Sequence, residues 1–397
     1  MHIAILGRQP ALGIAELERL YGADAVSWFG ADAALIDTDR FNFNALGGSQ
    51  KAGEVVATFH KKSWRDVGDL IMKQYSELWR DVDFKITLGL SAYGWNVSAR
   101  EVQKTGIILK KKLRDQNVSL RLIPNDLPAL STATSHHNKL GLSRNKVELL
   151  IVRANDTIIV AESIGSQNIT ALAARDQARP KTDAFVGMLP PKLARMMVNM
   201  AYGPDPEAIR RNSGDSAPVI LDPFCGTGVL LQEAALLAFD IYGSDLSQKM
   251  VSYTSANLEW LEQKYNLDLN KRVDEGDAMT HQWLPPIDAV AAEAYLGQPF
   301  SAPPSPAKLR EVRGNCNHII TSFLENIGRQ VTPDTPFCLA VPAWNNGNDR
   351  FTHLPLVNEL ERYGYERIEL KNVRAEQLLY FRPGQVVARE LLLMRKA

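Results

Sequence analysis

The chain has few cysteines, no long apolar run and no net charge, and each absence excludes a class of proteins. Its 397 residues include three cysteines, which are widely spaced. A scattered, odd number of cysteines argues against a disulfide framework or a zinc cluster and favours a reducing cytoplasm. No stretch suits a bilayer, and the apolar run at residues 3–6 is too short for a secretion signal. With 45% hydrophobic and 23% charged residues, we expect a soluble cytoplasmic protein of two or three domains without a membrane partner or a metal.

The formal net charge of zero gives no overall reason to expect a nucleic-acid partner, but the charges are spread unevenly. Between residues 85 and 153 the chain has twelve basic residues and four acidic ones. A local excess of this kind can form an electrostatic footprint for phosphate groups even in a neutral protein. The alternative is a solvated helix face with scattered surface charge, which is the better interpretation of any single lysine.

The most informative stretch is residues 222–228, Asp-Pro-Phe-Cys-Gly-Thr-Gly, which follows an apolar strand-like run and precedes a helix-like segment. Because Gly226 and Gly228 lack side chains and tolerate positive φ, this turn lets the backbone come close to a ligand. A dinucleotide-binding turn would need a small residue where Leu231 stands, and a phosphate loop would need a following Gly-Lys-Ser or Gly-Lys-Thr. Both nucleotide sites are therefore disfavoured, and an ordinary strand-to-helix turn is the remaining alternative to a binding loop.

The same stretch closely resembles the first motif of S-adenosylmethionine-dependent methyltransferases. The resemblance implies an α/β domain with the Rossmann-like, seven-stranded sheet of class I methyltransferases. It also implies that Asp222 approaches the methionine end of the cofactor and that the glycines make room for it. By this resemblance the cofactor-binding residues of the turn are Asp222, Phe224, Cys225, Gly226, Thr227 and Gly228.

Two further acids follow strand-like segments. Asp245 ends a second strand about twenty residues after the turn, where a carboxylate can accept hydrogen bonds from both ribose hydroxyls of a nucleoside. Asp277 follows a third strand, at the position where methyltransferases bind the adenine amino group, and a plain turn aspartate is an equal alternative. With their neighbours Leu246 and Ala278, these acids complete the expected cofactor site.

A candidate catalytic loop, Glu293-Ala294-Tyr295, ends a fourth strand, where amino-methyltransferases carry Asp or Asn, two prolines and an aromatic residue. An exocyclic amine on a base is a poor nucleophile, because its lone pair is delocalised into the ring. Two oxygen acceptors can hold the nitrogen toward a methyl sulfonium while an aromatic ring stacks on the base. We expect Glu293 and the Ala294 carbonyl to be the acceptors and Tyr295 the stacking face, in a direct in-line transfer.

This loop departs from the family pattern in two residues, and it is one residue shorter than the common form. Ala294 replaces a proline, which keeps the carbonyl but gives up the rigidity that aims it. Glu293 is one methylene longer than the usual aspartate. A strand-end acid exposed by chance is the alternative interpretation of Glu293. We expect the departures to affect the rate of the reaction more than cofactor binding.

The region from residue 64 to residue 169 predicts alternating helices and strands, including a basic helix at residues 98–116. With residues 119–121 and 132–140, it resembles the THUMP domain of RNA-modifying enzymes. His136 and His137 lack partners at metal-ligand spacing. The RNA-binding residues that this resemblance implies are Lys104, Lys111, Arg114, Arg121 and Lys139.

Residues 175–180 and 187–195 resemble the motif that precedes the glycine turn in THUMP-containing tRNA guanosine N2-methyltransferases, so that the resemblance covers nearly the whole chain. It implies S-adenosylmethionine-dependent methylation of the exocyclic N2 of a guanosine in tRNA, with guanosine 10 as the target. We expect a ferredoxin-like cap at residues 1–60, a THUMP domain at residues 61–168 and a methyltransferase domain at residues 169–397. Two alternatives stay open: an amino-methyltransferase that acts on ribosomal RNA or DNA, and a catalytically weak RNA-binding subunit that needs a small activator partner.

Overall fold

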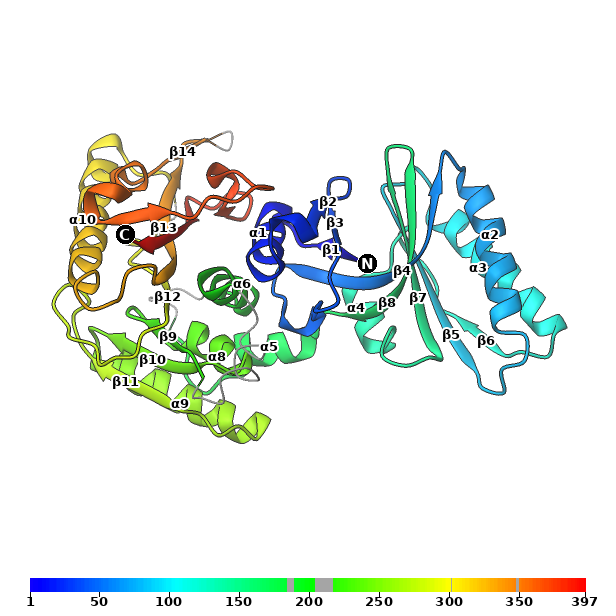
Figure 1. Cartoon of the computed structure of the whole chain (residues 1–397), viewed down its shortest axis with the longest axis horizontal. Coiled ribbons are helices and arrows are strands. Elements are labelled where there is room, and N and C mark those ends of the chain that lie inside the picture. Colours follow the sequence, from blue (N-terminus) through cyan, green and yellow to red (C-terminus); the bar gives the residue numbers. More distant parts are fainter. Residues whose placement is uncertain (184–188, 204–216, 301, 348–349) are drawn as a thin grey trace. The chain divides into compact units, whose positions relative to one another are not determined.

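The computed structural model of the chain describes residues 1–183, 189–203, 217–300, 302–347 and 350–397. Its contacts divide the chain into two compact units (Figure 1). Unit 1 contains residues 1–10, 24–44 and 49–170, and unit 2 contains residues 11–23, 45–48 and 171–397. Gly187 and Met188, which belong to the predicted motif at residues 187–195, lie outside the described residues.

Unit 1 is built on a mixed sheet of eight described strands in the order β2-β3-β1-β4-β8-β7-β5-β6. The long strand β4 pairs antiparallel with both β1 and β8, and two register shifts against β8 bend it. One sheet therefore runs continuously from the N-terminal strands to the strands around residue 150. The strands are β1 (His2–Leu6), β2 (Val26–Trp28), β3 (Ala33–Ile36), β4 (Ser49–His60), β5 (Ile86–Tyr93), β6 (Leu120–Leu122), β7 (Lys146–Ala154) and β8 (Thr157–Ser166).

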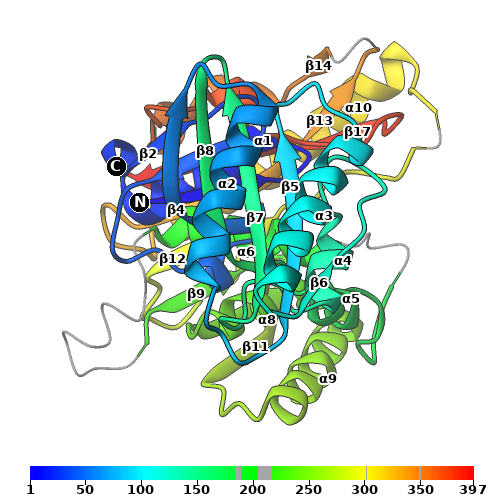
Figure 2. The same ribbon diagram turned by 90° about the vertical axis from the view of Figure 1, so that its right-hand side faces the viewer.

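Two amphipathic helices, α2 (Trp64–Leu78) and α3 (Ala99–Asp115), cover one face of this sheet (Figure 2). Each begins with a capping box, in which the side chains of a serine and of an acid three residues later satisfy each other's backbone amides. Helix α3 buries Val102, Leu109 and Leu113 against the strands. Its basic residues are left in solvent, as the apolar spacing predicts.

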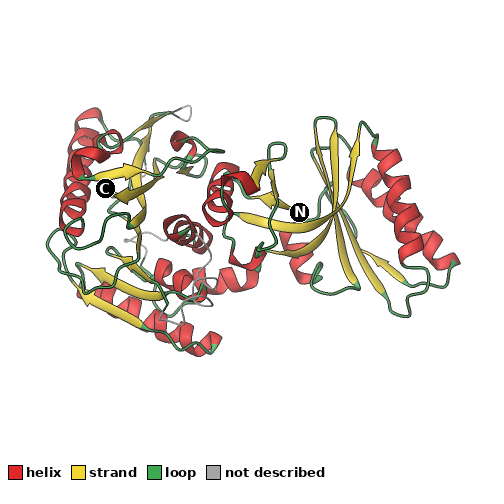
Figure 3. Ribbon diagram, in the orientation of Figure 1, coloured by secondary structure: helices red, strands yellow, loops and turns green. Residues whose placement is uncertain are grey.

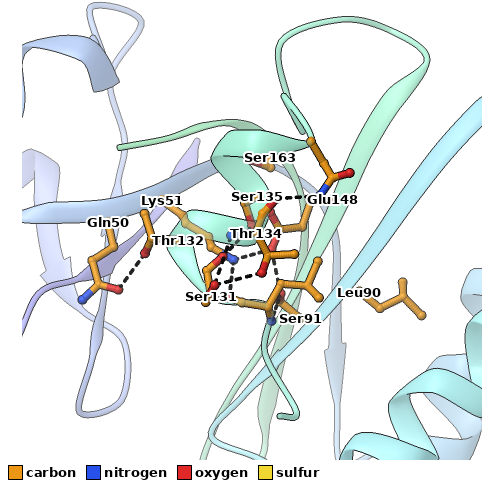
Figure 4. A network of polar contacts seen from close by, with 12 residues as sticks. Gln50, Lys51, Leu90, Ser91, Ser131, Thr132, Thr134, Ser135, Glu148 and Ser163 are labelled. Carbon is orange, nitrogen blue, oxygen red and sulfur yellow. Dashed lines mark hydrogen bonds and ion pairs between the residues drawn. The ribbon is translucent and has the colours of Figure 1, made fainter. Parts of the chain in front are cut away.

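The opposite face of the sheet carries a buried polar network below the short helix α4 (Thr132–His137) (Figure 4). Lys51 of β4 and Glu148 of β7 form an ion pair with 1% and 0% of their side chains exposed. The Lys51 Nζ also donates to the Leu130 carbonyl at 2.8 Å, and Ser91 of β5 donates to the same Glu148 carboxylate at 2.6 Å. Burial lowers the pKa of Lys51. The network ties three strands to the loop that leads into α4.

Unit 2 contains a second mixed sheet, whose main path of described strands is β11-β10-β9-β12-β13-β17-β15. The first five strands on this path are parallel to one another, and β17 is antiparallel to both of its neighbours. The predicted seven-stranded sheet is confirmed, and two short strands, β14 and β16, extend it beside β13 and β17. The strands are β9 (Val219–Asp222), β10 (Asp240–Asp245), β11 (Lys271–Glu275), β12 (Ala289–Glu293), β13 (Pro336–Asn345), β14 (Phe351–Thr352), β15 (Tyr365–Arg367), β16 (Leu379–Tyr380) and β17 (Val387–Lys396).

Helices pack on both faces of this second sheet (Figure 3). On one face α6 and α8 lie side by side, and Arg175 and Arg195 both form ion pairs with the buried Glu233 of α8. On the other face α10 buries an apolar stripe against β12 and β13. The helices around this sheet are α5 (Ile169–Gln177), α6 (Pro191–Tyr202), α8 (Val229–Leu236), α9 (Gln248–Tyr265) and α10 (Pro306–Ile327).

Helix α1 (Pro10–Tyr21) contributes almost all of its length to unit 2, although the strand before it belongs to unit 1. The carboxylate of its buried Glu16 accepts hydrogen bonds from the amides of Gly47 and Gly48 and from the Asn199 side chain of α6, at 2.7 to 2.8 Å. Glu18 accepts hydrogen bonds from the amides of residues 371 and 372. The acids of α1 are thus structural groups of unit 2.

Candidate active site

The glycine turn joins β9 to α8 and is fixed by backbone hydrogen bonds. The amide of Cys225 donates to the Ser244 carbonyl of β10 at 2.9 Å, and the amide of Gly228 donates to the Cys225 carbonyl at 2.7 Å. Both glycines have positive φ, 51° at Gly226 and 77° at Gly228. Other residues rarely adopt this conformation, so that the two glycines allow the turn.

The two glycines preserve space for different neighbours. Gly226 lines the cavity described below, whereas Gly228 does not. A Cβ on Gly228 would lie 2.9 Å from Cγ2 of Thr254 in α9, so its missing side chain lets two helices approach. In the same way, a Cβ on Gly243 of β10 would lie 2.5 Å from Cδ1 of Leu231 in α8. A dinucleotide site needs a small residue on the helix so that the helix and the strand can pack closely. In this chain the helix carries Leu231, and the small residue is Gly243 on the facing strand.

The carboxyl ends of β9, β10 and β12 open into a cavity of about 570 Å³. Ligands of open α/β sheets bind at this edge. Except for Gly228, every cofactor and catalytic residue predicted from the sequence lines it. These residues are Asp222, Phe224, Cys225, Gly226, Thr227, Asp245, Leu246, Asp277, Ala278, Glu293, Ala294 and Tyr295.

Two acids at strand ends are held in place by backbone amides. Asp222 is 3% exposed, and its carboxylate accepts a hydrogen bond from the amide of Phe224 at 3.2 Å. Burial raises the pKa of Asp222 well above its ordinary value, and the nearby Asp245 and Glu293 raise it further. Asp245 accepts hydrogen bonds from the amides of Gly226 and Ser247, both at 2.9 Å, and burial raises its pKa as well. The two acids therefore suit a hydroxyl-bearing ligand, or a cationic one that would favour their charged form.

The candidate catalytic loop leaves the sheet at the end of β12. The amide of Ala294 still donates to the Ala340 carbonyl of β13 at 3.0 Å, and Ala294 is 2% exposed. Tyr295 follows with 42% of its surface exposed, beside the cavity. Gly297 then turns the chain with a φ of 83°, and a Cβ there would lie 2.7 Å from Val312 of α10. The loop is thus anchored at both ends.

Pro342 of β13 determines where the pairing of β12 stops. In the parallel ladder Glu293 pairs with Ala340, so that the next bond would run from the amide of residue 342 to the Ala294 carbonyl. Proline has no N–H to donate. Among the described residues none donates to the Ala294 carbonyl. Its oxygen therefore stays available at the edge of the cavity.

Comparison with known proteins finds a family for the segment that carries the glycine turn and Asp245. Residues 179–274 match the family described as RMKL-like, methyltransferase domain. This part of the chain, about a quarter of its length, is therefore similar to a methyltransferase domain. The solved structure of TrmN from Thermus thermophilus has a TM-score of 0.52 with this chain, at 16% identity, over 100% of this chain and 99% of that one. The predicted class I methyltransferase fold is confirmed.

Curated relatives match parts of this chain. A tRNA (guanine(10)-N2)-dimethyltransferase of Methanothermobacter thermautotrophicus is 31% identical over 169 residues, which cover 42% of this chain and 43% of that protein. The enzyme of the same name from Methanocaldococcus jannaschii is 44% identical over 81 residues, 20% of this chain and 19% of that protein. The matched segments span less than half the length of these relatives.

The structure adds residues around the cavity that the sequence analysis did not name as site residues. Asn315 and Ile319 of α10 line the cavity, and so does Leu189 just before α6. Arg389 of β17 forms an ion pair with Glu293. The apolar spacing of residues 312–324 was a signal for α10, and a charged pair within the apolar strand at residues 387–394 was a signal for Arg389.

The five predicted RNA-binding residues are all exposed and lie on different parts of unit 1. Lys104, Lys111 and Arg114 belong to α3, and Arg121 belongs to β6. Lys139 lies beyond α4, on the other face of the sheet (Figure 1). The structure brings the three α3 residues together and separates them from Lys139.

Other kinds of site receive little support from the described part of the chain. His136 lies in α4 within hydrogen-bond distance of the Thr170 hydroxyl, at 3.1 Å, and no described group of three or more His, Cys, Asp or Glu side chains could hold a metal ion. The three cysteines are free and buried. Among the described residues, no helix is both long and apolar enough to cross a membrane.

Proposed function

We propose that the protein transfers a methyl group from S-adenosylmethionine to the exocyclic N2 of a guanosine in tRNA, with guanosine 10 as the target, and that it acts in the cytoplasm. The observation that carries this proposal is one cavity in which the strand-end acids of β9 and β10 meet the loop Glu293-Ala294-Tyr295. The names of the two curated relatives supply the nucleotide and the atom. Because these relatives match in part of their length, the substrate belongs to the proposal.

The residues of the cavity suit the three parts of the cofactor. Asp222, a buried carboxylate, would bind the methionine ammonium group. Asp245 keeps lone pairs beside its two backbone bonds and would accept the ribose hydroxyls. Asp277 would bind the adenine amino group, next to the exposed Leu246. When bound, S-adenosylmethionine supplies an electrophilic methyl group on a sulfonium.

The loop after β12 would hold the amine that is methylated. Glu293 and the unpaired Ala294 carbonyl would accept its two hydrogens, and Tyr295 would stack on the base. As the N–C bond forms and the S–C bond breaks, the nitrogen becomes positively charged, and Glu293 would receive the proton that leaves it. The hydrogen bond from the Ala294 amide to Ala340 supplies part of the rigidity that a proline would give.

Unit 1 would bind the RNA. We propose that residues 61–168 form the THUMP domain and residues 1–60 its ferredoxin-like cap, with residues 169–397 as the methyltransferase domain. The basic surface of α3 supports this role, because lysine and arginine side chains in solvent can neutralise RNA phosphates. The target base would be turned out of its stack to reach Tyr295.

The test is transfer of labelled methyl groups from S-adenosylmethionine to unmodified tRNA transcripts, followed by nucleoside analysis. We expect N2-methylguanosine or N2,N2-dimethylguanosine in transcripts with guanosine 10 and none in transcripts with adenosine at that position. Glu293→Ala should remove transfer while S-adenosylmethionine still binds. Transfer to ribosomal RNA or DNA alone would overturn the choice of substrate. Cofactor binding without transfer to any nucleic acid would instead favour an RNA-binding subunit that needs a small activator partner.

A further inference from the structure

Arg389 contacts the catalytic loop from two strands away. In the sheet order β12-β13-β17, its Nε donates a hydrogen bond to Oε1 of Glu293, and the two side chains are 9% and 16% exposed. The arginine crosses β13 at Ala340 and Pro342, which are the register partners of Glu293 and Arg389. Paired residues and every second residue of a strand share a face, so all four lie on one side of the sheet. Small residues at the two β13 positions leave room for the arginine side chain to cross.

The charges around the cavity show what this contact does. Four carboxylates line the cavity, those of Asp222, Asp245, Asp277 and Glu293, and its described lining includes no Lys, Arg or His. Arg389 therefore neutralises one acid from outside the cavity. The next residue, Glu390, points to the opposite face of β17 and lies 2.8 Å from Nδ1 of His353. Among the described residues, Glu293 is the ion-pair partner of Arg389.

We propose that Arg389 is a positioning residue for methyl transfer, which fixes Oε1 of Glu293 so that Oε2 is the oxygen that faces the amine of the substrate. The inference rests on the proposed function. Glutamate has one more rotatable bond than the aspartate usual in such loops, and an arginine bond to one oxygen removes that freedom. Arg389 thus compensates for the longer acid of this chain, as the Ala340 hydrogen bond does for the missing proline.

Kinetics of transfer to tRNA test the positioning role. Arg389→Gln should lower kcat by about 100-fold with little change in the KM for tRNA, because a misplaced acceptor acts on the reaction more than on binding. Arg389→Lys should restore part of the loss. The double variant Glu293→Gln with Arg389→Gln should be no slower than the slower single variant, since the two groups act as one unit. Arg395→Gln is the matched control, because Arg395 lies on the same strand, pairs with the exposed Glu366, and is 49% exposed.

A second measurement separates positioning from a merely structural role and needs no turnover. Calorimetry compares binding of S-adenosylmethionine with that of uncharged S-adenosylhomocysteine. Arg389→Gln leaves the Glu293 charge unneutralised, so the affinity for the cationic S-adenosylmethionine relative to S-adenosylhomocysteine should rise on the order of tenfold. Glu293→Gln should lower the same ratio. If Arg389 had only a structural role, its substitution would change the affinities for both ligands by the same factor.

The outcomes distinguish this proposal from the proposed function. If the wild-type protein binds no S-adenosylmethionine, the proposed function and the role of Arg389 are both overturned. If the wild-type protein binds and transfers but Arg389→Gln keeps a kcat within twofold, the role of Arg389 alone is overturned. The role of Arg389 would also be overturned if the kcat losses of the two single variants multiplied in the double variant. An unchanged ratio of the affinities for the two ligands in Arg389→Gln would overturn it as well.

Discussion

At the scale of single residues, Asp222 combines a cost to stability with a proposed role in cofactor binding. A carboxylate that is 3% exposed and lies near two other acids is unfavourable in its charged form. Among the described residues, the amide of Phe224 is the donor to its side chain. Such an acid is useful when a cationic group binds beside it, because the ligand then supplies the missing partner.

Asp222→Asn should therefore stabilise the protein without ligand and weaken cofactor binding. A pKa raised above 3.8 means that the folded state holds a proton that the unfolded state has lost, so this group's contribution to stability falls as pH rises through the raised pKa. The substitution should remove that dependence and raise the free energy of unfolding at neutral pH on the order of 1 kcal/mol. Denaturation across a pH series and calorimetry with S-adenosylmethionine measure both effects. A less stable variant with unchanged affinity would contradict this role.

At the scale of secondary-structure elements, Pro342 shows how a neighbouring strand shapes the proposed catalytic loop. Pro342→Ala adds an amide hydrogen that can pair with the Ala294 carbonyl and extend the β12–β13 ladder. The oxygen proposed to hold the target amine would then be occupied, and we expect kcat to fall about tenfold, the effect of roughly one hydrogen bond. Pro336→Ala, at the first residue of the same strand, is the control and should leave kcat unchanged. Equal rates in both variants would show that the Ala294 carbonyl has no part in transfer.

The buried Lys51–Glu148 ion pair leads to a prediction about the stability of unit 1. Lys51→Met leaves Glu148 buried without its cation, and one oxygen of that carboxylate already has no partner in the described structure. We expect a loss of about 3 to 5 kcal/mol in the free energy of unfolding, whereas replacing both residues with methionine should recover most of it. Lys61→Met is the control, because Lys61 and Asp156 are 69% and 54% exposed and such pairs contribute about 1 kcal/mol or less. Chemical denaturation of the full chain measures all three, and equal losses from Lys51→Met and Lys61→Met would contradict the argument.

The elements also explain how much of the site could be predicted from sequence. Asp222, Asp245 and Glu293 each stand directly at the end of an apolar strand, and the carboxyl ends of neighbouring parallel strands meet at one edge. Local sequence was therefore enough to place them together. Arg389 lies about a hundred residues from its partner, and its role depends on which strand lies beside β13. Whether Asn315 faces the cavity depends on the rotation of α10 about its axis, and the packing of the helix against the sheet determines that rotation.

At the scale of the whole molecule, the chain separates the proposed chemistry from the proposed RNA binding. The cavity lies within unit 2, and the candidate RNA-binding residues lie within unit 1. The formal net charge is zero, so long-range attraction to tRNA has to come from local groups of cations rather than from the protein's total charge. The α3 residues are such a group, because a single helix holds them together on its exposed face.

The salt dependence of tRNA binding measures how much each face of the unit 1 sheet contributes. Each phosphate contact that is lost lowers the slope of log K against log salt concentration by roughly 0.7 to 0.9. The triple variant Lys104→Gln, Lys111→Gln, Arg114→Gln should therefore reduce the slope by about two to three, and weaken binding to different tRNAs alike. Lys139→Gln, on the other face, should reduce it by about one at most. An unchanged slope in the triple variant would remove α3 from the RNA interface, and a larger change from Lys139→Gln than from the triple variant would move the interface to the α4 face.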